Sequence, residues 1–116
     1  MFWKRGGKMN EQEQVITFEE ACRTTALSIA ETVIQKHKDY GVDNILIFRE
    51  RGLIVRVFDK ISRLKNIVWN NDDHVNVPES VDDTWKDMAG YAIIGLMLSQ
   101  GNFTNPLAQG EDNGEN

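Results

Sequence analysis

Three carboxylates recur at four-residue intervals in this chain: Glu79, Asp83 and Asp87. On an α-helix, side chains four residues apart lie on one face, so these acids would stack in a row and repel one another. A divalent cation offsets that repulsion, because hard cations take carboxylate oxygens as ligands. The spacing therefore predicts a site for a hard divalent cation, with these three acids as both metal ligands and candidate catalytic groups.

The same acids also have a purely structural interpretation. Pro78 suits the first turn of a helix, where acidic side chains interact favourably with the helix dipole. Ser80 followed by Asp83 resembles a capping box with Asp in place of the usual Glu. From the pattern alone, capping and solvation explain the acids at least as well as metal binding does.

The acids lie at the start of the stretch that reads most clearly as a helix, from Pro78 to Ser99. Its apolar residues at helical spacing define a face opposite the acids. They are Val81, Trp85, Met88, Ala89, Ala92 and Leu96. Beyond Asp87 the acidic side continues into Gly90 and Ile94, so the second half is apolar nearly all round. We therefore expect burial on more than one side, with the acids at the mouth of a bundle.

A second helix is predicted from Gly52 to Trp69 and carries further candidates. Its expected core face comprises Leu53, Ile54, Val57, Ile61, Leu64 and Val68. On the other face, Asp59 is a possible fourth metal ligand. Arg56, Lys60 and Arg63 are candidate phosphate contacts, since cationic side chains form charge-assisted hydrogen bonds with phosphate. The alternative for Asp59 and Arg63 is a simple surface ion pair at i,i+4.

Four more residues are candidates for holding a nucleotide. Lys38 could contact phosphate, although basic residues in the last turn of a helix also suit the dipole, which explains both Lys36 and Lys38 without a function. Tyr40 and Tyr91 could stack on a base, and Asn44 could read a base edge. For each tyrosine, core packing is the simpler alternative.

The N-terminal half contributes one long helix and one ambiguous segment. Thr17 and Glu20 fit a capping box, and an apolar stripe runs from there to about Gln35. Its members are Phe18, Cys22, Ala26, Ile29, Ala30, Val33 and Ile34, which makes Cys22 a small core residue. Residues 42–50 are either a short helix capped by Asp43 or a buried connector.

Length and composition bound the architecture and the partners. The chain has 116 residues and a formal net charge of -5, which fits one small domain. The negative charge argues against sequence-independent nucleic-acid binding, and we expect no direct sequence-specific binding either. One cysteine excludes an internal disulfide, and we expect no secretory signal, no membrane span and a cytoplasmic location.

These elements predict an all-α domain over residues 15–101, with flexible tails at 1–14 and 102–116. It would be a small bundle of about three to four main helices. Phe103 and Leu107 in the second tail could pack back. A long apolar helix in so short a chain makes a homodimer or larger homo-oligomer plausible.

Three fragments together resemble a known family. They are KDYG at residues 38–41, GLIVRVFDKISRLKNI at 52–67 and ESVDDTWKDMAGYAII at 79–94. In this order they resemble the nucleotide-modification-associated domains of phages and bacteria. The arrangement also looks like the all-α NTP pyrophosphatases, the MazG-like and dimeric dUTPase-like enzymes, although Asp59 stands where those enzymes carry a pair of glutamates. The resemblance implies acids that hold Mg²⁺ (or Mn²⁺) against a nucleoside triphosphate.

Two functions follow from these expectations. The first is a metal-dependent nucleoside triphosphate pyrophosphohydrolase, acting on deoxynucleotides in nucleotide pool control or DNA modification. The metal would neutralise phosphate charge and activate a water, with a spare carboxylate as general base. The alternative is a non-catalytic helical module that binds a nucleotide or a partner protein in nucleotide metabolism.

Overall fold

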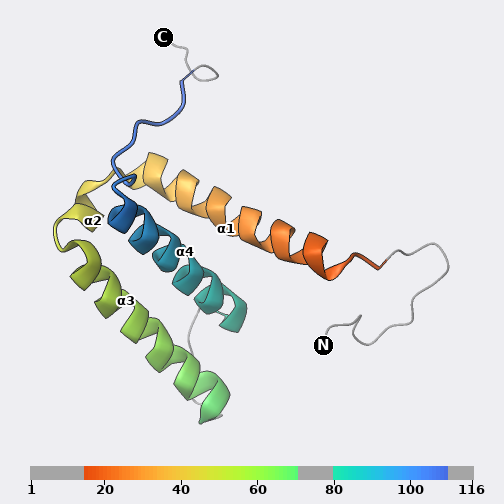
Figure 1. Cartoon of the computed structure of the whole chain (residues 1–116). Helices are drawn as coiled ribbons and strands as arrows, with labels where there is room; N and C mark the ends of the chain where they lie inside the picture. The colour runs from red at the N-terminus through yellow and green to blue at the C-terminus, as the bar shows by residue number, and fades with distance from the viewer. Residues whose placement is uncertain (1–14, 71–79, 110–116) are drawn as a thin grey trace.

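The computed structural model describes residues 15–70 and 80–109, and every regular element in these two ranges is helical (Figure 1). The first helix, α1, spans Phe18–Tyr40, and a single short turn, α2, spans Asp43–Leu46. Helix α3 spans Arg49–Leu64 and continues as a π-helical turn over Lys65–Trp69, and α4 spans Val81–Gln100. The expected all-α class is confirmed.

Local signals set the ends of the long helices. The capping box of α1 is present: the Glu20 N–H donates to Thr17 Oγ1 at 3.1 Å, and the Thr17 N–H donates back to Glu20 Oε1 at 3.4 Å. Ser80 caps α4, because its Oγ accepts from the Asp83 N–H at 3.0 Å. Glycines at positive φ, Gly41 and Gly101, end α1 and α4. Each of these four ends follows the sequence pattern.

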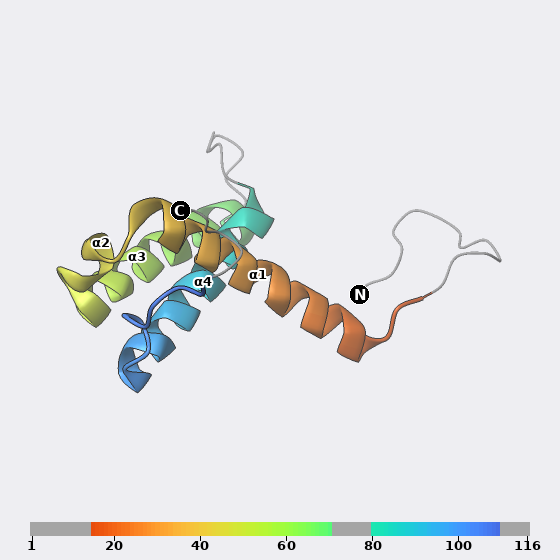
Figure 2. The same cartoon turned by 90° about the horizontal axis from the view of Figure 1, so that it is seen from above.

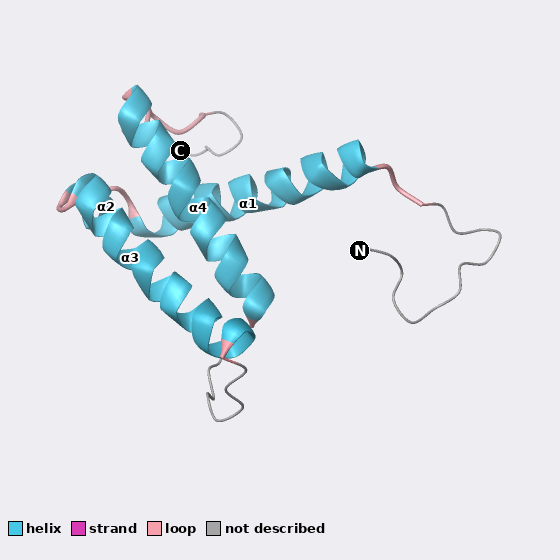
Figure 3. Ribbon diagram, turned by 60° about the horizontal axis from the view of Figure 1, so that its bottom comes forward, coloured by secondary structure: helices cyan, strands magenta, loops and turns pink. Residues whose placement is uncertain are grey.

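In Figure 1, α4 lies between α1 and α3, and in the view of Figure 3 α4 and α1 cross one another. Helix α4 packs most extensively on α3 and less on α1. The N-terminal half of α1 projects beyond the other helices (Figure 2). The buried apolar core is small and gathers where the helices converge with α2. It comprises Ile45, Leu53, Leu98 and Phe103.

Glycines and a threonine allow α4 to approach its neighbours closely. Gly90 is buried, and a Cβ at that position would meet Val33 Cγ2 of α1 at 3.3 Å. On the α3 side, Gly95 faces Leu53. Thr84 is fully buried, and its Oγ1 donates to the Ser80 carbonyl at 2.9 Å, which satisfies the hydroxyl inside the helix. These small residues fix α4 as the central helix.

The predicted apolar face of α4 does not point toward α1 or α3. Trp85 and Leu96 are 57% and 59% exposed, whereas Asp87, Gly90 and Ile94 face the neighbouring helices. The second half of α4 is apolar on both sides, so either side could have been the one that the neighbouring helices cover. Among the helices that the structure describes, α1 and α3 cover one apolar side of α4, and it is the side that carries the acids.

Three other local expectations need correction. The predicted core face of α3 is split, because Ile54, Ile61 and Val68 are exposed while Leu53 is buried. Cys22 is exposed, since none of the other described helices packs on the projecting half of α1 (Figure 2). Asp43 is the first residue of α2 and not its cap, because Val42 holds that position without a side-chain hydrogen bond.

Two further findings complete the fold. Phe103 is buried just beyond Gly101, so it packs back as the sequence suggested, while Leu107 is half exposed. Within the described ranges, no helix combines the length and the low polarity needed to cross a membrane.

Candidate functional site

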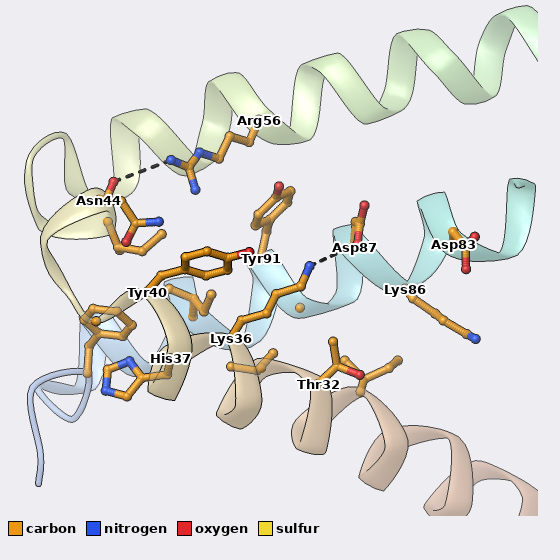
Figure 4. A pocket seen from close by; sticks show the side chains of 17 residues that line it. Thr32, Lys36, His37, Tyr40, Asn44, Arg56, Asp83, Lys86, Asp87 and Tyr91 are labelled. Carbon is orange, nitrogen blue, oxygen red and sulfur yellow. Dashed lines mark hydrogen bonds and ion pairs between the residues drawn. The ribbon is translucent and has the colours of Figure 1, made fainter. Parts of the chain in front are cut away.

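A groove of about 470 Å³ opens between α1 and α3, with α4 running between them (Figure 4). Its volume falls within the range of roughly 300–1,000 Å³ that small-molecule sites occupy. The apolar part of the lining comes from all three long helices, α2 and the segment after α4. It comprises Ile29, Val33, Ile45, Ile94 and Phe103. His37 closes one end by packing edge-on against the Phe103 ring, with centroids 5.3 Å apart.

Asp87 of α4 is the electrostatic centre of the groove. Lys60 Nζ of α3 lies 3.0 Å from Asp87 Oδ2, and Lys36 Nζ of α1 lies 3.9 Å from Asp87 Oδ1. The Lys60 side chain is only 13% exposed and that of Asp87 is 28% exposed. One carboxylate is therefore shared by two cations from two different helices.

Arg56 of α3 occupies the opposite wall beside Tyr91. Its guanidinium carbon lies 6.0 Å from the centroid of the Tyr91 ring, within cation–π range. One terminal nitrogen donates to the Asn44 carbonyl at 3.5 Å, a long hydrogen bond that links α3 to α2. The guanidinium is thereby oriented along the groove, and it retains donors for a ligand.

Tyr40 is the last residue of α1 and is 69% exposed. Figure 4 shows its ring and that of Tyr91 turned toward the same part of the groove. Gly41 follows Tyr40 with φ 75° and ψ -159°, a conformation that is essentially restricted to glycine. This turn brings α2, and with it Asn44, back to the groove wall. The two tyrosines and Asn44 thus share one end of the groove.

The structure brings together six of the candidates chosen from the sequence. They are Tyr40, Asn44, Arg56, Asp83, Asp87 and Tyr91. Lys60 joins them through its ion pair with Asp87. Lys38 lies on α1 outside the groove lining, and Glu79 lies outside the described residues.

Asp59 and Arg63 are also outside the groove lining. They form the i,i+4 pair that was the structural alternative, with Arg63 Nη2 3.7 Å from Asp59 Oδ2. The Asp59 side chain is 66% exposed. The structure therefore does not bring Asp59 together with Asp83 and Asp87.

Sequence reasoning missed four polar groove residues: Thr32, Lys36, His37 and Lys86. A usable signal existed for Lys36, because it lies four residues before Tyr40 and therefore on the same face of α1. Because Lys36 lies in the last turns of the helix, its charge was attributed to the helix dipole, and a role in binding was not considered. For Lys86 there was no comparable spacing signal.

The described residues do not assemble a resident metal site. No group of three or more His, Cys, Asp or Glu side chains suited to a metal ion occurs within residues 15–70 and 80–109. Two carboxylates reach the groove, and one of them, Asp87, is already held by lysines. Magnesium commonly binds through one or two carboxylates together with substrate phosphates. Asp83 and Asp87 could bind magnesium in this way, together with the phosphates of a substrate. They are too few to hold the ion with protein ligands alone.

Comparison with known families now adds to this geometry. The family described as "Nucleotide modification associated domain 1" matches residues 36–98, more than half of the chain. The chain belongs to this family. No curated protein and no solved structure matches it. The likeness to the all-α NTP pyrophosphatases stays a prediction.

The family match shows which groove residues belong to the nucleotide-modification-associated domain. All the charged lining residues fall within residues 36–98, from Lys36 to Asp87, as do both tyrosines. Only Ile29, Thr32, Val33 and Phe103 of the lining lie outside. The domain therefore carries the polar chemistry of the groove, while the flanking segments complete its apolar walls.

Proposed function

We propose that the groove binds a nucleoside phosphate. The observation that carries this proposal is the convergence of cations from three helices on one groove beside two tyrosines. Lys36, Arg56 and Lys86 line the groove, and Lys60 reaches its edge. Among the residues that the structure describes, two carboxylates, Asp83 and Asp87, line the same groove, in a chain whose formal net charge is -5.

The polar end of the groove suits the phosphates. Lys36 and Lys86 come from facing helices, α1 and α4, and Asp87 already recruits Lys36 to this end. A phosphate brings several acceptor oxygens, and cationic donors bind them through short, charge-assisted hydrogen bonds. The loose 3.9 Å contact between Lys36 and Asp87 leaves the ammonium able to exchange one anion for another.

The aromatic end suits the base. The Arg56 guanidinium lies over one face of the Tyr91 ring, and Tyr40 supplies a second, exposed ring. A base that stacks on an aromatic face or on a guanidinium plane gains about 1–3 kcal/mol. Asn44 lies beside these rings with an amide that can both donate and accept.

Calorimetric titration with the standard ribo- and deoxyribonucleoside triphosphates tests the proposal. We expect saturable binding of at least one nucleotide, weakened by added salt because the phosphate contacts are ionic. Lys36→Ala should weaken binding about tenfold to a hundredfold, the effect of losing one charge-assisted bond. Lys38→Ala, two residues along the same helix and outside the groove lining, is the matched control and should bind as the parent does.

A second candidate is hydrolysis of the bound triphosphate to a monophosphate and pyrophosphate, with magnesium entering on the nucleotide. The orientation of Asp83 and Asp87 into the same groove as the cations favours it. These two side chains would hold the ion. A bound Mg²⁺ supplies charge neutralisation for the phosphates. The lysines that hold Asp87 would keep the carboxylate oriented until the nucleotide arrives.

Chromatographic analysis of products distinguishes the two candidates. Monophosphate plus pyrophosphate, formed only with Mg²⁺ or Mn²⁺ and abolished by Asp83→Asn, would establish the hydrolase. Binding of the nucleotide without turnover under the same conditions would leave the groove as a binding module. Absence of both would contradict the proposed function.

A further inference from the structure

A second cavity, of about 400 Å³, adjoins the groove where α2 meets α3. All its lining residues fall within residues 44–56, and we call it the turn pocket. Three residues line both hollows: Asn44, Ile45 and Arg56. Figure 4 shows part of this shared wall as the dashed contact from Arg56 to Asn44, close to the two tyrosines. The turn pocket therefore begins at the aromatic end of the groove, and one ligand could enter both.

The charged side chains that line the turn pocket are three arginines: Arg49, Arg51 and Arg56. Among the residues that the structure describes, no carboxylate lines this pocket. Arg49 has a loose contact with the adjacent Glu50, with 3.8 Å between Nε and Oε1. Guanidinium groups bind phosphate through paired, charge-assisted hydrogen bonds. Three of them around one cavity, in a chain of formal net charge -5, indicate that its ligand is anionic.

Arg49 also has an unusual backbone conformation, with φ of 53°. This left-handed region is disfavoured for a residue that carries a Cβ, whereas glycine adopts it without strain. Strained backbone of this kind is concentrated at ligand-binding positions in proteins. Glycine would serve the turn into α3 at least as well. The arginine side chain at position 49 therefore needs a reason other than the stability of the turn.

Phe48 supplies the turn pocket with an aromatic face. It is 68% exposed, although its Cβ lies against the first turn of α3. A Cβ at Gly52 would meet the Phe48 Cβ at 2.9 Å, which is closer than real contacts allow. Glycine at position 52 thus lets the turn fold back onto α3, beside the buried Leu53. The pocket combines an aromatic ring, an apolar wall and cations, as the groove does.

The size of the turn pocket indicates how much of a ligand it holds. About 400 Å³ is close to the 470 Å³ of the groove and more than one phosphate group needs. A second nucleoside suits this space, since bases of every kind stack on aromatic rings. Arg56 lines both hollows, so a phosphate that joins two nucleosides would lie beside it. Its contact with the Asn44 carbonyl is long, at 3.5 Å, so a phosphate oxygen can compete for the guanidinium.

We propose that the groove and the turn pocket together bind a 5′-phosphorylated dinucleotide. The 5′-phosphate would lie near Lys36 and the first base near the two tyrosines. The linking phosphate would lie at Arg56 and the second base on Phe48, with Arg49 and Arg51 around it. Binding of this kind rests on the proposed function, because it extends the ligand of the same groove.

Calorimetric titration tests the second subsite. The probes are the dinucleotides pdApdA, pdCpdC, pdGpdG and pdTpdT, each compared with its own deoxynucleoside 5′-monophosphate. We expect at least one dinucleotide to bind with one molecule per chain. It should bind about tenfold to a hundredfold more tightly than its monophosphate, because it adds a stacked base and a phosphate contact.

The ratio of dinucleotide to mononucleotide affinity is the readout for variants. Arg51→Gln should lower this ratio about tenfold, because Arg51 lines the turn pocket and not the groove. Arg23→Gln is the matched control: it removes the same charge from an exposed position on α1 and should keep the ratio of the parent.

Arg49→Gly separates binding from folding. It removes a guanidinium from the turn pocket and should also lower the ratio about tenfold. Because glycine relieves the left-handed backbone, the Tm of this variant should be no lower than that of the parent. A loss of dinucleotide affinity in a protein of undiminished stability cannot be caused by unfolding.

Three results would overturn the inference. The first is saturable binding of monophosphates with no gain for any dinucleotide, which would leave the proposed function standing. The second is two monophosphates bound per chain without a gain for the dinucleotide, which would make the turn pocket a separate site. The third is an unchanged ratio in both Arg51→Gln and Arg49→Gly. Absence of binding by mononucleotides and dinucleotides alike would contradict the proposed function itself.

Discussion

Lys60 of α3 and Asp87 of α4 form a 3.0 Å ion pair at the edge of the groove. Lys36 of α1 approaches the other oxygen of the same carboxylate. A single side chain thus connects three helices that are far apart in the sequence. The pair also affects the electrostatics of the groove: Lys60 offsets the charge of Asp87, and the groove then has more cationic than acidic side chains among the described residues.

The pair between Lys60 and Asp87 should contribute measurably to stability. Both side chains are mostly buried, so a double-mutant cycle with Lys60→Met and Asp87→Asn should give a coupling energy of ~1–3 kcal/mol. The matched pair is Asp59 and Arg63, which is longer and has an exposed carboxylate. A cycle with Asp59→Asn and Arg63→Met should give about 0–1 kcal/mol in the same urea titrations. Equal coupling in both cycles would contradict the distinction.

Arg56 should contribute to ligand affinity more than to stability. Arg56→Gln removes the charge and the guanidinium beside Tyr91, and we expect nucleotide binding to weaken about tenfold to a hundredfold. Arg51→Gln on the same helix is the control, since Arg51 is exposed and outside this groove. Calorimetry measures both variants. Equal losses would indicate that the charge of α3 as a whole, and not the position of Arg56, attracts the ligand.

The Tyr91 ring, rather than its hydroxyl, should hold the base. Tyr91→Phe retains the aromatic face and should keep affinity within about threefold of the parent. Tyr91→Ala should lose about 1–3 kcal/mol of binding free energy. Circular dichroism confirms that both variants are helical before binding is compared. If Tyr91→Phe instead lowered the affinity by much more than about threefold, the hydroxyl would be the group that recognises the base.

Gly41 should be required for its backbone conformation. Its φ of 75° lies where side chains are strained, so Gly41→Ala should destabilise the fold by about 1–3 kcal/mol. Gly95→Ala is the contrasting change: the new Cβ would meet Leu53 Cδ1 at an ordinary 3.7 Å, and alanine is favoured in helices by about 1 kcal/mol. In thermal unfolding, Gly41→Ala should therefore lower the Tm and Gly95→Ala should raise it.

The sequence predicted the helices well because their signals are local. Thr17 and Ser80 cap helices, and Gly41 and Gly101 end them, through contacts within a few residues. It did not predict which apolar side of α4 the chain itself covers, because both sides are apolar. Trp85 and Ile94 are equivalent by pattern, and only packing against α1 and α3 distinguishes them.

The same limit applies to the site. Tyr40, Asn44 and Arg56 could be chosen because each is a polar or aromatic residue without an evident structural role. Lys36 was explained by the helix dipole, although its ammonium reaches Asp87 some fifty residues along the chain. Asp59 was chosen as a metal ligand by its residue type and position. In the structure it lies on an exposed side of α3 and pairs with Arg63. Contacts between helices, unlike caps, have no local sequence signature.

The most direct test of the nucleotide-binding groove is a nuclear magnetic resonance titration of the full chain with nucleoside triphosphates, recorded with and without magnesium. If the groove binds a nucleoside phosphate, backbone amide signals of Gly41, Asn44 and Gly90 should shift saturably with one or more nucleotides. Signals of Phe58 and Leu96, which are exposed and lie outside the groove lining, should stay in place. No saturable shift with any standard nucleotide, or shifts confined to residues away from the groove, would contradict the account.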